Sequence, residues 1–112
     1  KLGRHEDALR LKRETLALER AILRPDNPTI AISMHNLADT YVDLGQYQDA
    51  LSLEKEALTF FQRCLPKHPV IAVLVQTLVK IYLALGRLGD AIATKRCNGK
   101  LRPYEECKFL SF

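Results

Sequence analysis

A Leu-Gly pair recurs at nearly constant spacing, and it constrains the fold of this chain more than any other feature. The pair begins at positions 2, 44 and 85, so the second interval is one residue shorter than the first. A second marker keeps the same frame: Asp-Ala followed by Leu or Ile begins at positions 7, 49 and 90. Self-similarity at a period of about 42 residues indicates an architecture built from stacked repeats.

The junctions between the units explain why the second interval is shorter. The first junction reads Leu-Arg-Pro-Asp-Asn-Pro over residues 23–28, and the next reads Leu-Pro-Lys-His-Pro over residues 65–69, one residue fewer. Asn27 followed by Pro28 predicts a helix N-cap with proline at the first helical position. The prolines of the second junction predict that one helix ends and another begins there.

Between these markers the apolar residues follow a helical period. They recur at steps of three and four on both sides of Gly45, which places them on one face of a helix. Each unit therefore reads as two antiparallel helices joined at a turn, where Gly45 and Gly86 supply the left-handed residue. The expected helices cover residues 4–23, 28–43, 47–64, 69–84 and 88–97.

The predicted fold class is all-α, an α-solenoid of antiparallel hairpins with about five helices. We expect a repeat array over residues 1–96, made of a partial repeat (1–27), a second repeat (28–68) and a third, degenerate repeat (69–96). Residues 97–112 form a tail outside the repeat frame. Because the chain begins inside a repeat, and a continuous core usually needs about three repeats, we expect a piece of a longer array.

The residues in this frame resemble the tetratricopeptide repeat. The matching positions of the second unit are Asn36, Leu37, Ala38, Tyr41, Leu44, Gly45, Tyr47, Ala50, Leu51, Ala57 and Leu58. The third unit keeps most of the markers, but Asn98 and Gly99 stand where the family has Ala-Leu. The long period and the Pro-Asp-Asn-Pro junction resemble the kinesin light chain and nephrocystin branch of the family.

The resemblance implies a right-handed superhelix that acts as a non-enzymatic scaffold and binds a partner peptide or domain on its concave face. The implied groove residues are Ile32, His35, Asn36, Asp39, Val42 and Asp43 in the second unit, and Val73, Gln76, Thr77, Lys80 and Leu83 in the third. Asn36 is the strongest single candidate, because the family commonly uses an Asn there to hold a ligand's backbone. Thr77 replaces it one repeat later. Self-association through open repeat ends is a further expectation.

Asp39 and Asp43 lie one helical turn apart and leave three interpretations open. They could receive a basic ligand, act as paired carboxylates, or form a solvated polar face. Acid–base chemistry would need burial and an enclosed pocket, whereas stacked hairpins offer an open groove. The sequence also has no Gly-rich phosphate loop and no serine framed as a nucleophile. We therefore expect neither an enzyme nor a cofactor.

The cysteines predict free thiols rather than a disulfide framework or a zinc site. They are Cys64, Cys97 and Cys107, an odd number at wide spacing. The histidines are His5, His35 and His68. Only Cys64 and His68 are close in sequence, and Pro66 breaks the helix that would align them. We expect no metal site and a reducing, cytoplasmic environment.

An RNA-binding helical repeat is the alternative function. The net charge is +4, but 17 basic residues are interleaved with 13 acidic ones, without the basic stripe of a dedicated nucleic-acid binder. Asp39 and Asp43 would also repel phosphate, so a nucleic-acid partner is disfavoured. The sequence contains no run of about 18 apolar residues, so no membrane span is expected.

Two segments allow more than one interpretation. Residues 70–75 are all apolar, which predicts burial between neighbouring helices or an exposed adhesive surface. Residues 95–108 hold five basic residues against two acidic ones, a net charge of +3, and Phe109, Leu110 and Phe112 follow. This end of the chain reads either as a cap over the last hairpin, which we favour, or as a disordered segment unrelated to the repeat.

Overall fold

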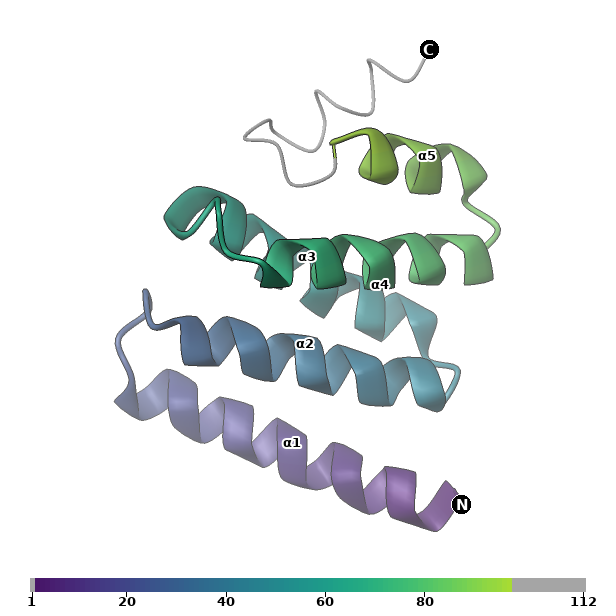
Figure 1. Ribbon diagram of the computed structural model, residues 1–112. Helices are drawn as coiled ribbons and strands as arrows, with labels where there is room; N and C mark the ends of the chain where they lie inside the picture. The colour runs from purple at the N-terminus through teal and green to yellow at the C-terminus, as the bar shows by residue number, and fades with distance from the viewer. Residues whose placement is uncertain (1, 98–112) are drawn as a thin grey trace.

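The computed structural model describes residues 2–97, and these residues form five α-helices joined by short loops. The helices are α1 (Leu2–Ile22), α2 (Pro28–Asp43), α3 (Tyr47–Cys64), α4 (Val70–Ala84) and α5 (Leu88–Cys97). They stack in chain order with neighbours running antiparallel, α1 at one end and α5 at the other (Figure 1). The predicted all-α solenoid is confirmed, and the expected helix ranges agree with the observed bounds to within two residues.

The contacts between helices run almost entirely between neighbours in the chain. α1 packs on α2, α2 on α3, α3 on α4 and α4 on α5. A smaller contact joins α2 to α4. Contacts limited to adjacent elements are characteristic of repeat solenoids. The two helices that precede the Leu-Gly turns, α2 and α4, thus lie close enough to share a surface.

The start of α2 follows from the predicted cap. Asn27 has an extended backbone, and its side-chain Oδ1 accepts a hydrogen bond from the Thr29 N–H at 2.9 Å. Pro28 occupies the first helical position, where its missing N–H would have had no helical partner. The predicted Asn-Pro helix start is therefore confirmed.

The turn after α2 depends on a left-handed glycine. Gly45 has φ 77° and donates its N–H to the Val42 carbonyl at 3.0 Å, while Gln46 donates to the Tyr41 carbonyl at 2.8 Å. This pair of bonds is a Schellman motif, which satisfies carbonyls that the end of the helix leaves free. Gly86, with φ 74°, forms the same motif after α4. Both hairpins therefore turn in the same way.

Small side chains set the distance between α2 and α3. Ala38 of α2 and Ala50 and Ala57 of α3 are completely buried. Because a methyl group adds little to the helix radius, the two backbones approach closely, and larger side chains fill the space beside them. The larger buried side chains include Leu37, Leu58, Phe61, Leu74, Leu78, Ile81 and Tyr82.

The apolar run at the start of α4, residues 70–75, is partly buried and partly exposed. Ile71, Leu74 and Val75 are buried, as expected of a helix packed between neighbours. Val73 keeps 46% of its surface exposed, and Ala72 is exposed as well. The run is thus helical, with one face in the core and one face open.

The predictions for residues 98–112, including the cap and the charged segment, lie outside the described residues. Cys97 is the last residue of α5. Among residues 2–97, none of the helices combines the length and the apolarity needed to cross a membrane.

Replacing Gly45 with alanine is expected to lower the free energy of unfolding by about 1–2 kcal/mol, because an L-residue is strained at positive φ. A Cβ at Gly45 would meet no atom within 4 Å, so the loss would report backbone strain alone. Gly89→Ala, inside α5 and equally open, is the matched control and should be neutral or stabilising by about 0.5–1 kcal/mol. Urea unfolding of both variants tests this, and equal effects would contradict it.

Candidate functional site

The predicted groove residues of α2 occupy the face of that helix that no other helix covers completely. Asn36, Asp39 and Asp43 are exposed, whereas Ile32, His35 and Val42 are half-buried at its margins. On an α-helix, residues three or four apart share a face, so Asn36, Asp39 and Asp43 form one polar row. The structure thus brings these side chains together on one surface.

The equivalent face of α4 has a different chemistry. Leu83 keeps 53% of its surface exposed, and Val73 is similarly open. Gln76 and Lys80 are also exposed, and Thr77 is half-buried. Lys80 holds the place in its repeat that Asp39 holds in the repeat before. The open surface therefore changes from acidic on α2 to apolar and basic on α4.

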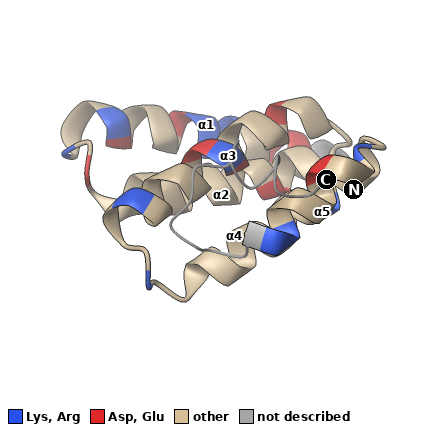
Figure 2. Ribbon diagram, turned by 90° about the horizontal axis from the view of Figure 1, so that it is seen from above, with Lys and Arg blue, Asp and Glu red and all other residues tan. Residues whose placement is uncertain are grey.

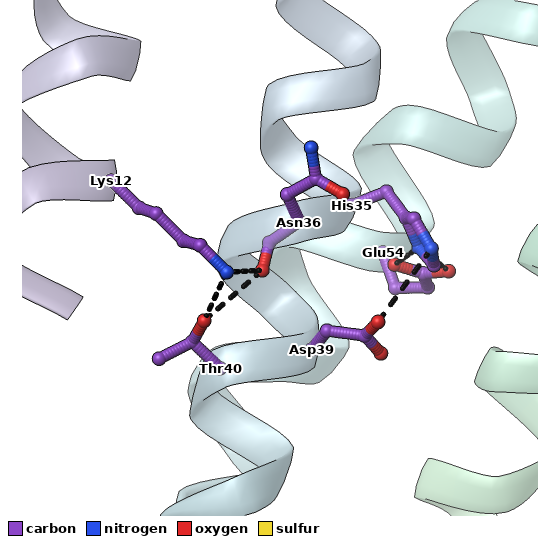
Figure 3. Close-up of polar contacts among 6 residues, drawn as sticks. All are labelled: Lys12, His35, Asn36, Asp39, Thr40 and Glu54. Carbon is purple, nitrogen blue, oxygen red and sulfur yellow. Dashed lines mark hydrogen bonds and ion pairs between the residues drawn. The ribbon is translucent and has the colours of Figure 1, made fainter. Parts of the chain in front are cut away.

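His35 connects this surface to a buried carboxylate. Its Nδ1 lies 2.9 Å from Oε2 and 3.0 Å from Oε1 of Glu54, which is completely buried in α3. Its Nε2 lies 3.9 Å from an oxygen of Asp39, so the imidazole stands between the two carboxylates (Figure 3). Only 12% of the His35 side chain remains exposed. His35 therefore makes its closest contact with Glu54 inside the protein, and only its edge reaches the open surface.

The pKa values of both partners move upward. The hydrogen bond to Glu54 raises the pKa of the His35 imidazole above its usual value, against the opposing effect of burial, and the charges of Glu54 and Asp39 add to the rise. Burial raises the pKa of the Glu54 carboxyl, and the hydrogen bond from His35 opposes this. The folded pair therefore holds its protons more tightly than the separate side chains would in water.

Lys12 of α1 contacts α2 at Asn36 and Thr40. Its Nζ donates to Thr40 Oγ1 at 2.8 Å and to the backbone carbonyl of Asn36 at 3.4 Å (Figure 3). Thr40 Oγ1 in turn donates to the Asn36 carbonyl at 3.3 Å. These bonds use the backbone of Asn36 and leave its carboxamide, which points away from Lys12 in Figure 3, available to a partner.

Asp43, at the end of the polar row, lies close to α1. Its carboxylate is 3.9 Å from Nε2 of His5, and both side chains are substantially exposed. A contact of this length between exposed groups stabilises little. Asp43 thus remains accessible at the edge of the surface.

The chain matches a known family over the first three helices. Residues 1–63 match the tetratricopeptide repeat. The chain belongs to the tetratricopeptide repeat family. Repeats of this family are a scaffold type that generally mediates interactions between proteins. No curated protein matches this chain.

The family match ends one residue before α3 does. The assignment of α4 and α5 to a further repeat therefore rests on the internal markers. The Leu-Gly turn at Gly86 and the Asp-Ala pair at Asp90 keep the repeat frame there. The glycine geometry supports this, because Gly86 and Gly45 share the same left-handed conformation and hydrogen-bond pattern.

Cys64 and His68 are close in sequence, and His68 has contacts of its own in this tetratricopeptide fold. Cys64 is an exposed free thiol. The ring of His68 packs 5.1 Å from that of Phe61, and its Nδ1 accepts the Val70 N–H at 3.1 Å. Across residues 2–97, the structure brings no three His, Cys, Asp or Glu side chains into a metal-binding group.

Glu54 and Lys12 are polar residues of the site that the sequence analysis missed. Glu54 falls on the apolar face of α3, four residues after Ala50 and four before Leu58. That spacing alone places a charged residue in the core and so indicates a buried partner. Lys12 holds the same place in the first repeat that Glu54 holds in the second. Comparing the units position by position would have singled out both.

Lys12→Met is expected to lower the free energy of unfolding by about 1 kcal/mol, because it removes the ammonium group that bonds to Thr40 while keeping an apolar stem. Arg10→Met is the matched control: Arg10 pairs with Asp7 on the exposed side of the same helix, so its loss should change stability by about 0.5 kcal/mol at most. Thermal unfolding in low salt measures both. An Arg10 effect as large as that of Lys12 would refute the assignment.

Proposed function

We propose that this tetratricopeptide array binds a peptide segment of a partner protein along the open face shared by α2 and α4. The observation that carries the proposal is the composition of that face. It combines the exposed apolar groups Val73 and Leu83 with hydrogen-bonding and charged groups at Asn36 and Asp39. Interfaces commonly join apolar anchors to polar groups that fix orientation.

The charge of the face favours a partner that is basic over α2 and apolar over α4. Asp39 and Asp43 present two carboxylates one turn apart, and each side chain is more than half exposed. Leu83 and Val73 offer apolar contact on the neighbouring helix. A Lys- or Arg-containing segment followed by apolar residues would match this order. Because the array is short and the ion pairs are exposed, we expect dissociation constants on the order of micromolar.

The repeat spacing supports a place in the kinesin light chain-like branch of the family. The Leu-Gly markers follow one another at a period of about 42 residues, longer than the usual tetratricopeptide unit of about 34. The first junction also contains Pro-Asp-Asn-Pro.

We further propose that the protein works in the cytoplasm, in keeping with an exposed free thiol at Cys64. Attachment of a partner, rather than catalysis, is the role that the open face favours.

Both signs of charge are interspersed along α1 and α3, which disfavours RNA as the partner (Figure 2). The RNA-binding alternative remains testable by the salt dependence of binding. Phosphate contacts release counterions, so an RNA complex would weaken steeply between about 50 and 200 mM salt. Tight, steeply salt-dependent RNA binding together with weak peptide binding would overturn the proposal.

Selection of peptides from a random displayed library by the whole chain should enrich Lys or Arg next to apolar residues. For a selected peptide, Asp39→Asn or Asp43→Asn is expected to weaken binding about two- to fivefold in low salt, because each removes one exposed ion pair. Fluorescence anisotropy with labelled peptide measures this.

Asp49→Asn is the matched control, because Asp49 is exposed on α3 beside Arg13 and Arg20 of α1, outside the proposed face. Peptide affinity should be unchanged in this variant. If Asp49→Asn weakens binding as much as Asp39→Asn, the peptide responds to net charge alone and the proposed face is wrong.

A further inference from the structure

Glu54 lies where one repeat meets the next. Its counterpart in the first repeat is Lys12, and Lys12 bonds to Thr40 on the first helix of the following repeat. The same position in α3 therefore faces α4, which packs on α3 and also contacts α2. Glu54 is completely buried at this junction of three helices.

The facing position of α4 offers Glu54 no hydrogen bond. Thr40, which accepts the bond from Lys12, is replaced one repeat later by Ile81, a completely buried apolar residue. The hydrogen bonds of the Glu54 carboxylate that the structure gives go instead to Nδ1 of His35. A buried carboxylate without a donor costs several kcal/mol in general. The imidazole of His35 on α2 is thus the partner that the structure gives this buried carboxylate.

Few other charged groups surround the pair. Asp39 faces His35 from its own helix at 3.9 Å. α4 contributes one charged residue, Lys80, which is exposed, and the buried phenol of Tyr82. On α3 the neighbours of Glu54 in sequence are Lys55, half-buried, and Glu56, exposed. The pKa of His35 is therefore set mainly by Glu54, and the pKa of Glu54 by its burial and then by His35.

We propose that His35 and Glu54 form a proton-controlled latch inside the second repeat, on the helix pair that α4 packs against, which holds α4 in place while the pair is protonated and loosens it when the proton leaves. With its proton, the imidazole is a cation that compensates the buried carboxylate. Without it, a carboxylate remains at an apolar junction beside a neutral ring. The latch does not rest on the proposed peptide binding, because it is argued from the packing of α2, α3 and α4 alone.

The direction in which the stability of the fold changes with pH follows from the pKa shifts of His35 and Glu54. The pKa of His35 is raised in the folded chain, so its contribution to stability is present below the unfolded pKa of about 6.5 and is lost as the pH rises through the folded value. The pKa of Glu54 is also raised, so folding favours its protonated form and this contribution too is lost as the pH rises. Both contributions to stability therefore decrease as the pH rises, that of Glu54 from about 4.5 upward and that of His35 from about 6.5 upward.

Hydrogen exchange of the intact chain between pH 6 and pH 9, corrected for intrinsic rates, tests the latch. Protection of the α4 amides is expected to fall over this range, because the folded pair loses the proton that it holds more tightly than the unfolded chain does. His35→Gln should change this pH profile, because it leaves the Glu54 carboxyl as the titrating group of the pair. His5→Gln is the matched control, because His5 contacts only the exposed Asp43 among the ion pairs of the described residues, and it should keep the wild-type pH profile.

Glu54→Leu keeps the proposal testable if His35→Gln does not fold. Leucine suits an apolar junction beside Ile81, so this variant should fold and show α4 protection that is flat between pH 6 and pH 9. A wild-type slope in either His35→Gln or Glu54→Leu would overturn the latch. So would an equal fall in protection in α1, which is remote from the junction.

Discussion

The packing of α2 on α3 is the contact on which the rest of the stack is built, and Ala38 of α2 and Ala50 and Ala57 of α3 are completely buried in these two helices. Three methyl groups with no exposed surface let the two backbones approach closely. The aromatic ring of Phe61 and the leucines around it then fill the remaining volume. α4 in turn packs on α3 and also contacts α2, so it rests on this closely packed pair.

Most of the fold could be predicted because its determinants are local and repeated. Asn27, Pro28 and Gly45 each act through backbone geometry within a few residues, so their effect can be read directly from the sequence. The recurrence of the same markers at nearly equal spacing then fixes the pairing of helices. The division of residues 70–75 into buried and exposed halves could not be predicted in this way. An apolar helix gives no periodic signal of which face its neighbours cover.

The site was less accessible to prediction, for a physical reason. The exposed row of Asn36 and Asp39 could be placed from helical spacing, and whether it binds a partner stays a prediction. The role of His35 depends on Glu54, which lies on another helix 19 residues later. Such a pairing has no local signature, because it arises only when the hairpin closes. In the sequence, Glu54 stands out only as a charged residue at an apolar position, and this does not identify its partner.

The linear order of helix contacts has a consequence for how the chain loses structure. Within residues 2–97, α1 packs on α2 and reaches α3 only through the exposed Arg20–Glu56 ion pair, and α5 packs on α4, whereas α2, α3 and α4 each pack on at least two other helices. The end helices can therefore detach one at a time without breaking the centre, as in a one-dimensional array where each element depends on its neighbour. α5 is the shortest helix, with 10 residues, and should fray first. Among the five described helices, melting would then proceed inward, and the α2–α3 hairpin would be the last to remain ordered.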